Sequence, residues 1–398
     1  MGNIKKNIFN IIFQTCFLLL LLIILEGVSY ITIHNIGSES DKVYRTFPNF
    51  IATKPLAFKN TDDYAEVKKS FEKEAVKCRG KIVYIEKNGF PRYEKNNFDC
   101  PGEVLVDGLR KTLNQPEVFS KKILIFGGST IWGTGSADRN SIPSLIQKKI
   151  NDNLSEKIKV INYGFTTVTI NQQINLLRTV ALDSNVLVIF YDGGNDIFQS
   201  MVNENSDGSI IGYNQKNKLD IYIQSVKFFL SNNSYTYRLL SLIRSNANKS
   251  SSSHCDESDQ NKSKKLMEKG FDSYMSNIKL ARSYVQSKDA KFIHFLQPSL
   301  FYKDLKYSEY EINIINNSPL GVNKCKIYQQ RVQQGYKYYS DKYKNSPDDD
   351  GLNNLVNSLD SVKNEQEYYL DNLHISSAGN IIVADRIFEA IITEYDKN

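Results

Sequence analysis

Short apolar runs alternate with amphipathic stretches from about residue 121 onward. An apolar run at 123–126 precedes an amphipathic stretch at 142–150, and a strand-like run at 157–164 precedes a helical pattern at 171–182. Residues 186–191 are apolar or aromatic at every position, which is typical of a strand buried on both faces of a parallel sheet. The pattern therefore predicts a βαβαβ unit.

The alternation resumes after two interruptions. A helical pattern at 265–286 leads into a fourth predicted strand at 291–296, and a final amphipathic helix is predicted from residue 377 to about 395. We interpret the interruptions, residues 199–265 and 301–367, as insertions. Strands that alternate with helices predict a parallel sheet, and ligands of such sheets gather at the carboxyl ends of the strands.

The N-terminal residues have a different pattern. Lys5 and Lys6 precede a mostly apolar stretch at residues 8–25, and apolar residues continue to Ile33. This length suits a tilted membrane span, and the basic residues before it favour a cytoplasmic N-terminus. A cleaved signal peptide is the alternative, although no convincing cleavage site follows the stretch. We expect residues 1–35 to be a cytoplasmic tip and transmembrane anchor, with the rest of the chain periplasmic or extracellular.

Cysteine usage favours an oxidising compartment. Apart from Cys16, the chain has an even number of cysteines, for which we predict the pairs Cys78–Cys100 and Cys255–Cys325 because each lies outside the predicted sheet. Four unpaired buried thiols are the alternative. No Cys-x-x-Cys occurs and the histidines are dispersed, so no zinc site is predicted.

Composition excludes some classes of function. The chain has 398 residues, 41% of them hydrophobic, and a net charge of +6, with no basic run interleaved with aromatics, so no nucleic-acid groove is predicted. It also lacks a Gly-x-x-x-x-Gly-Lys phosphate loop. We expect no cofactor. Residues 36–120 lack sustained periodicity and are interpreted as a membrane-proximal cap or stalk, whereas 121–398 form the main domain.

A serine at a strand end suggests the chemistry. Ser129 follows Gly127 and Gly128 after the first apolar run, and Asp371 and His374 stand far downstream. A serine hydroxyl needs an imidazole as base and a third group to fix the tautomer of that imidazole. The three-residue spacing puts the carboxylate and the ring on the same side of the backbone. These residues predict a serine hydrolase.

Four short blocks occur in a fixed order along the predicted strand ends and the last loop. They are Gly127-Gly128-Ser129, Asn162-Tyr163-Gly164, Gly193-Gly194-Asn195-Asp196 and Asp371-Asn372-Leu373-His374. Each is weak alone, but together they resemble the SGNH hydrolase superfamily, also called the GDSL esterases. The resemblance implies a three-layer α/β/α, flavodoxin-like parallel sheet, to which this chain adds the predicted N-terminal transmembrane helix.

The resemblance also implies roles for individual residues. Ser129 is the nucleophile, His374 the general base and then acid, and Asp371 the group that orients His374. The oxyanion hole is formed by the backbone N–H groups of Ser129 and Gly164 and by the side-chain amide of Asn195.

Two features resemble a membrane-anchored subgroup of the superfamily. Gly128 occupies a place usually held by Asp, and anchored members often have Gly-Gly-Ser-Thr here. The segment at residues 107–112, Asp-Gly-Leu-Arg-Lys-Thr, also resembles that subgroup.

Several neighbouring residues have other interpretations. Asn195 is alternatively a turn residue that satisfies its own loop. Asp192 and Asp196 are interpreted as structural, and His294, inside an apolar strand, as a packed core histidine. The pair at 297–298 follows that strand and is weakly predicted to line the site.

The resemblance implies a membrane-anchored serine esterase that acts, through an acyl-enzyme on Ser129, on ester groups, most simply O-acetyl groups, of an extracytoplasmic carbohydrate. Its expected partners are an acylated glycan and the membrane. Hydrolysis and acyl transfer share the acyl-enzyme, so an O-acyltransferase remains open. A lipase or thioesterase of the same fold and a non-catalytic envelope glycan-binding or assembly protein are further alternatives.

Overall fold

The computed structural model describes a large part of the chain. The described residues are 14, 17, 20, 21, 23–31, 64–70, 78, 79, 82–84, 90–93, 95–202, 234, 236, 260–302, 307–317, 326–344, 352–354, 359 and 368–396. The chain divides into two compact units. Met1–Val43 and Asn214–His254 form the smaller unit, and Tyr44–Tyr213 and Cys255–Asn398 form the larger one, which we call the sheet unit.

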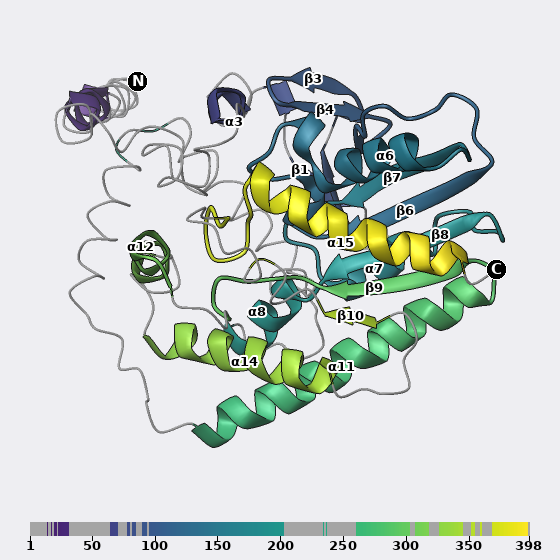
Figure 1. Cartoon of the computed structure of the whole chain (residues 1–398). Helices are drawn as coiled ribbons and strands as arrows, with labels where there is room; N and C mark the ends of the chain where they lie inside the picture. Colours follow the sequence, from purple (N-terminus) through teal and green to yellow (C-terminus); the bar gives the residue numbers. More distant parts are fainter. Residues whose placement is uncertain are drawn as a thin grey trace, which may run out of the picture. The chain divides into compact units, whose positions relative to one another are not determined.

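A parallel sheet forms the centre of the sheet unit (Figure 1). Its strands lie in the order β10-β9-β8-β6-β7. They are β6 (Lys121–Gly127), β7 (Ile158–Gly164), β8 (Val186–Asp192), β9 (Lys291–Leu296) and β10 (Leu352–Asn354). The four longer strands confirm the pattern predicted from the sequence. The short β10 lies within a predicted insertion. The sequence did not predict this strand, because Leu-Asn-Asn has no alternation of apolar and polar residues and no β-branched residue.

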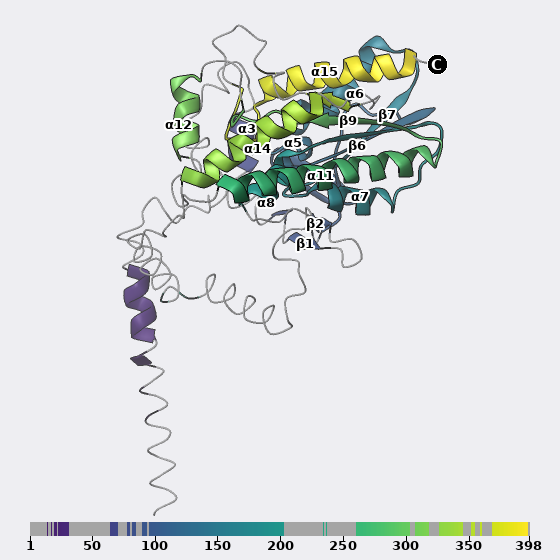
Figure 2. The ribbon, with the colours of Figure 1, turned by 90° about the horizontal axis from the view of Figure 1, so that it is seen from below.

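Helices cover both faces of this sheet, which confirms the three-layer α/β fold (Figure 2). On one face lie α6 (Ile142–Asn153) and α15 (Ser377–Asp396), and on the other lie α7 (Ile170–Leu177), α8 (Gly194–Val202) and α11 (Gln260–Gln286). The further helix α14 (Lys326–Lys344) contacts α8 and α11, and α12 (Glu309–Asn317) precedes it.

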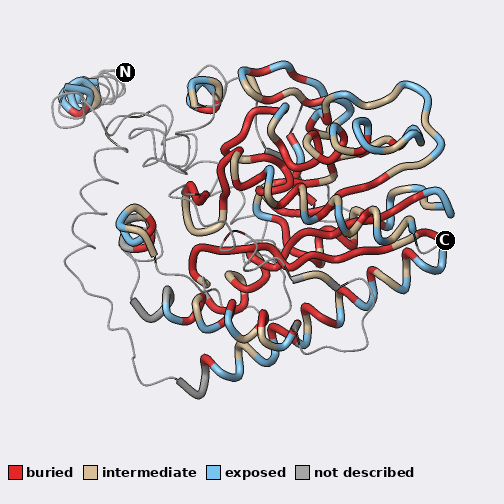
Figure 3. Tube along the Cα trace, viewed as in Figure 1, coloured by how far each residue is buried: buried red, intermediate tan, exposed pale blue. Residues whose placement is uncertain are grey.

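Burial follows the predicted pattern. Every residue of β8 is buried, as expected for a strand covered on both faces. Along α15, Val383, Ala384, Ile387 and Ile391 form one fully buried stripe, because residues three or four apart share a helix face. Figure 3 shows the strands buried and the helices exposed on their outer sides.

The strand order defines where a ligand can bind. β7 lies on one side of β6, and β8, β9 and β10 follow on the other side. The order in which strands are added to the sheet therefore reverses between β6 and β8. The loops after these two strands diverge at the carboxyl edge of the sheet. In open parallel sheets this switch point is where ligands bind.

The segment before β6 is part of the sheet unit. It contains α3 (Tyr64–Ser70) and the strands β1 (Ile82–Tyr84), β2 (Pro91–Tyr93), β3 (Phe98–Cys100), β4 (Glu103–Val106) and β5 (Leu109–Arg110). Phe90, Tyr93 and Phe98 pack in one cluster with Trp132, the last residue of the short helix at Ser129–Trp132, and with Phe165, which follows β7. The region predicted as a cap or stalk thus shares a core with the sheet's carboxyl edge.

The cysteines are described in part. Cys78 and Cys100 form a disulfide, as predicted. Cys255 and Cys325, the other predicted pair, lie outside the described residues.

Little of the smaller unit is described. Residues 23–31 are helical, and Glu26 accepts hydrogen bonds from the Ser234 hydroxyl and the Thr236 N–H, each over 3.1 Å. Within the described part of the chain, no helix is both long enough and apolar enough to cross a membrane. Much of the predicted anchor at 1–35, and most of the predicted insertion at 199–265, lies outside that part.

Candidate active site

Ser129 lies at the switch point of the sheet. It is the first residue of the short helix α5 (Ser129–Trp132), directly after β6 and Gly128. A side chain at Gly127 would come within 2.6 Å of the Tyr191 carbonyl oxygen, so the tight exit from β6 requires glycine there. Because Ser129 is the first helical residue, its own N–H has no acceptor within the helix.

A chain of hydrogen bonds joins Ser129 to the last loop. The Ser129 Oγ lies 2.7 Å from His374 Nε2, and His374 Nδ1 lies 2.7 Å from Asp371 Oδ2. The His374 side chain is buried, with 8% of its surface exposed. With the Asp371 carboxylate accepting a hydrogen bond from Nδ1–H, Nε2 is left with a free electron pair that faces the serine hydroxyl.

The loop that carries Asp371 and His374 is held by its own backbone. The Leu370 N–H donates to the His374 carbonyl over 2.8 Å, and the Ser376 N–H donates to the Tyr368 carbonyl over 2.8 Å. Asp371 Oδ1 accepts from the N–H groups of Leu373 and His374 over 2.8 and 2.7 Å. Both oxygens of the carboxylate are therefore fixed, one on the loop and one on the imidazole.

These contacts set the charge state of Asp371. Burial alone would raise the pKa of its carboxyl group, but the charge of His374 and the hydrogen bonds from His374 and Leu373 outweigh burial and lower the pKa below its ordinary value. Asp371 therefore stays ionised at neutral pH, as a group that orients an imidazole must.

Asn195 lies beside the nucleophile from the neighbouring strand. It stands in the first turn of α8, and its Nδ2 donates to the Val168 carbonyl over 2.8 Å. A side chain at Gly128 would come within 2.9 Å of this Nδ2, so the amide lies against the residue that precedes Ser129. The amide therefore satisfies a carbonyl of the segment between β7 and α7 and not of its own loop, and the oxyanion role of its second N–H stays a prediction.

The oxyanion role predicted for Gly164 is not supported. Its N–H donates to Asn162 Oδ1 over 2.8 Å and so has a partner already. A side chain at Gly164 would come within 2.5 Å of the Trp132 backbone nitrogen. Gly164 is therefore a glycine because β7 packs directly against α5.

Thr167 is the candidate that the sequence did not indicate. Its φ is +62°, a left-handed conformation that threonine rarely adopts, and the residue is exposed. No acceptor for its N–H occurs among the described residues. It lies next to Val168, whose carbonyl binds Asn195. No sequence signal marks it, because a positive φ is expected of Gly, Asn or Asp and not of Thr.

A Gly164→Ala substitution is expected to destabilise the fold. The added methyl group must displace the α5 backbone, since its nearest neighbours are backbone atoms of Ile131 and Trp132, and overpacking of this kind typically costs about 1–3 kcal/mol. Urea unfolding of the variant and the parent measures the difference. Unchanged stability would mean that α5 can move away from β7 freely.

The other predicted residues lie beneath the site or beside it. His294 is fully buried in β9, as predicted, and its ring contacts Asp192 and the hydroxyls of Tyr274 and Tyr343. The Gln297 N–H donates to the Asp192 carbonyl over 2.9 Å. Gln297 is buried, and its side chain lies against Gly194, just before Asn195. The structure therefore places Gln297 next to the segment that carries Asn195.

Arg110 supports the back of α5. Its side chain is buried, and its guanidinium donates to Asp138 Oδ1 over 2.7 Å and to the Trp132 and Ser136 carbonyls over 2.8 Å each. The predicted segment at 107–112 therefore ties the region before β6 to the turn that follows the nucleophile.

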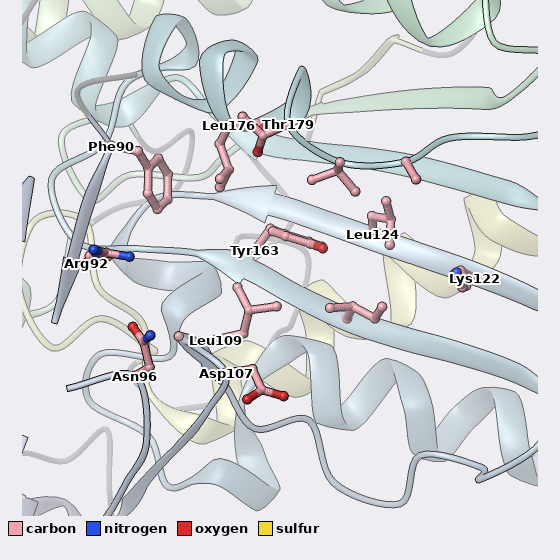
Figure 4. A pocket seen from close by; sticks show the side chains of 14 residues that line it. Phe90, Arg92, Asn96, Asp107, Leu109, Lys122, Leu124, Tyr163, Leu176 and Thr179 are labelled. Carbon is pink, nitrogen blue, oxygen red and sulfur yellow. The ribbon is translucent and has the colours of Figure 1, made fainter. Parts of the chain in front are cut away.

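A cavity of about 510 Å³ lies apart from these residues (Figure 4). Its lining includes Phe90, Arg92, Leu124, Tyr163 and Leu176, and none of the three residues of the hydrogen-bonded chain. In the described parts of the chain, no group of three or more His, Cys, Asp or Glu side chains is placed to hold a metal ion.

Comparisons with known proteins give structural similarity only. No family model matches the sequence, and no curated protein matches it. A lipolytic protein of the G-D-S-L family from Veillonella parvula is 12% identical, with a TM-score of 0.35, and the match covers 68% of this chain and 97% of that one. A putative lipolytic protein of the G-D-S-L family from Desulfitobacterium hafniense is 11% identical, with a TM-score of 0.34 and coverage of 68% and 99%.

A catalytic mutant of an acetylxylan esterase from Geobacillus stearothermophilus is 11% identical, with a TM-score of 0.35 and coverage of 69% and 96%. At these identities and scores, the matches carry no family assignment. The order of the four sequence blocks, the parallel sheet that carries them and the assembled Ser129–His374–Asp371 chain keep the resemblance to the SGNH, or GDSL, hydrolases.

Proposed function

We propose that the protein is a serine esterase that works through an acyl-enzyme on Ser129. The observation that carries this proposal is the continuous chain from Ser129 Oγ through the imidazole of His374 to the Asp371 carboxylate, with 2.7 Å at each step. Such a chain activates a hydroxyl that is otherwise a poor nucleophile at neutral pH.

In the first half-reaction, Ser129 Oγ bonds to the ester carbonyl carbon while His374 Nε2 takes the hydroxyl proton. The negative charge that develops on the carbonyl oxygen is met by N–H donors. We assign these donors to the Ser129 N–H, the second N–H of the Asn195 amide and the Thr167 N–H. His374 then gives its proton to the leaving alcohol oxygen as the ester bond breaks.

In the second half-reaction, a water molecule attacks the acyl carbon and His374 takes its proton. The bond to Ser129 Oγ breaks, and the proton returns from His374 to the serine. The products are a carboxylic acid and the free enzyme. If a sugar hydroxyl replaces water, the same steps transfer the acyl group, so an O-acyltransferase shares this site.

Asp371→Asn is expected to lower kcat by about 10⁴-fold, the loss typical when the orienting carboxylate of a triad becomes an amide. The amide N–H can donate a hydrogen bond to His374 Nδ1, which would place the imidazole proton on Nε2. Nε2 then cannot accept from the Ser129 hydroxyl. Stopped-time assays of ester hydrolysis give kcat, and circular dichroism checks folding. A folded variant with more than a tenth of the parent kcat would remove Asp371 from this role.

The substrate class is proposed on other grounds. The block order resembles family members that modify cell-envelope or exported polysaccharides, which supports an O-acetyl group on a carbohydrate. The apolar N-terminal stretch after Lys5 and Lys6 supports a membrane-anchored enzyme with its site outside the cytoplasm, and the Cys78–Cys100 disulfide suits an oxidising compartment.

The experiment is a chain-length series with the full-length protein in detergent. Hydrolysis of p-nitrophenyl acetate, butyrate and octanoate is compared, and acetate release from O-acetylated polysaccharide is measured beside them. The proposal predicts a preference for acetate and release of acetate from the glycan. A preference for octanoate would favour a lipase or thioesterase instead. A folded protein that hydrolyses none of the esters, with or without added glycan acceptor, would leave a non-catalytic glycan-binding protein.

A further inference from the structure

Two buried carboxyl groups lie four residues apart at the junction of β8 and α8. Asp192 is the last residue of β8, and Asp196 lies in the first turn of α8, with 3% and 4% of their surfaces exposed. In each, the Oδ2 atom has no hydrogen-bond partner. Buried polar atoms are normally paired, so two such oxygens on neighbouring acids require an explanation.

Asp192 contacts a phenol hydroxyl and an imidazole ring. Its Oδ1 accepts from the Tyr274 hydroxyl over 2.7 Å and lies 3.0 Å from His294 Nε2. On the other side of the ring, His294 Nδ1 contacts the Tyr343 hydroxyl. The Tyr274 hydroxyl and the His294 ring therefore both contact one oxygen of Asp192.

Asp196 has no comparable partner. Its Oδ1 accepts a hydrogen bond from the Ile170 N–H over 3.1 Å, at the start of α7. The titratable groups that face it are Asp192 from β8, Tyr274 from α11, and Tyr336 and Tyr339 from α14. None of these can be a cation, and Asp192 is a second acid. Backbone N–H groups of Gly193, Asp196 and Ile170 favour an ionised Asp196, but burial and the neighbouring Asp192 carboxyl group outweigh them.

The contact with Ile170 has a consequence for the oxyanion hole. Asn195 binds the Val168 carbonyl, and Asp196 binds the Ile170 N–H, so two adjacent residues of α8 hold the segment between β7 and α7. Thr167 and Val168 belong to that segment. Its position relative to Ser129 thus depends on both contacts.

We propose that Asp196 is a positioning residue that works as an uncharged carboxylic acid: its Oδ1 holds the start of α7, and its proton supplies the donor that the Asp192–Asp196 pair lacks. The proposal rests on the proposed esterase function and deepens it. Asp196 touches neither the substrate nor the reacting atoms. It keeps Asn195 and Thr167 in register with Ser129.

The electrostatics agree with this geometry. Burial, and next the charge of Asp192, raise the pKa of Asp196 well above its ordinary value. A carboxyl group whose folded-state pKa is raised binds more protons in the folded protein than in the unfolded one. Stability is then lost as the pH rises from the unfolded pKa toward the folded pKa.

The test compares Asp196→Asn with Asp196→Ala in the full-length protein. The amide keeps the Oδ1 acceptor and replaces the acid proton with an N–H donor, whereas alanine removes both. Asp152→Asn, at an exposed position of α6, is the matched control. Each protein is assayed for kcat and KM with p-nitrophenyl acetate, and for melting temperature, across the pH range from acid to alkaline.

The expected result is a rescue. At neutral pH, Asp196→Asn keeps kcat within about tenfold of the parent, whereas Asp196→Ala loses roughly 10²-fold or more in kcat with little change in KM, as for a misplaced oxyanion donor. On the alkaline side the parent loses activity as Asp196 ionises and the Asn variant does not. The melting temperature of Asp196→Asn rises relative to that of the parent as the pH increases.

One result would overturn the proposal. If Asp196→Asn loses as much kcat as Asp196→Ala, and its melting temperature differs from the parent's by a constant amount at all pH values, Asp196 is ionised in the parent. A parent enzyme without esterase activity would instead refute the proposed function. The pH dependence of the melting temperatures would then still decide whether Asp196 is a neutral acid, because it requires no substrate.

Discussion

Ser129→Ala is expected to lower kcat/KM for ester hydrolysis by about 10⁵- to 10⁶-fold. The substitution removes the only atom that bonds to the acyl carbon, while the oxyanion donors and the binding surface retain a small residual rate. His374→Ala should cost about as much, because the two residues act as a unit, and the double variant should be no worse than either. Initial rates with p-nitrophenyl acetate measure all three.

The matched control is Ser120→Ala. Ser120 precedes β6 at the opposite end of the strand, and its hydroxyl contacts Glu156 at the surface. This variant should hydrolyse the ester at the parent rate. Equal activity of Ser129→Ala and Ser120→Ala would show that hydrolysis does not pass through Ser129.

Arg110→Met is expected to destabilise the protein by about 3–5 kcal/mol, the usual cost of removing one partner of a buried ion pair. The guanidinium is almost fully buried and makes four hydrogen bonds, to Asp138 and to the carbonyls of Gly102, Trp132 and Ser136. Methionine keeps much of the volume but leaves the Asp138 carboxylate and three carbonyls without their donor. Urea unfolding gives the difference in the free energy of unfolding.

The pH dependence of this loss identifies its cause. Burial already raises the pKa of Asp138, although Arg110 opposes that shift. Without the cation the carboxyl group takes up a proton more readily, so Arg110→Met should be less destabilising in acid than at neutral pH. Lys111→Met, at the exposed neighbouring position, is the control and should change stability by less than about 0.5 kcal/mol. A similar small change for Arg110→Met would show that the pair is dispensable.

The sheet and the hydrogen-bonded set Ser129, His374 and Asp371 could be predicted because their sequence signals are local. The continuous apolar run at 186–191 is typical of a strand covered on both sides, and Asp371 and His374 are only three residues apart. Ser129 required one further step, the rule that the loops of a parallel sheet meet at the carboxyl edge.

The features that escaped prediction depend on contacts between distant segments. A glycine is compatible both with an N–H that faces a substrate and with one that donates to Asn162 Oδ1. The sequence therefore does not distinguish these two roles of Gly164, whereas the contacts between β7 and α5 do. Thr167 adopts a positive φ for which its side chain gives no signal. The region at 36–120 looked separate because its aromatic residues show no period, whereas Phe90 and Tyr93 pack across the chain on Phe165.

The most direct test of the account is to label the full-length protein with a fluorophosphonate, which reacts with activated serines, and to locate the adduct by peptide mass spectrometry. We expect one stoichiometric adduct on Ser129 in the parent, none in Ser129→Ala, and a labelling rate reduced by orders of magnitude in His374→Ala. A folded parent that remains unlabelled, or that carries its adduct on another serine, would contradict the claim that Ser129 is an activated nucleophile.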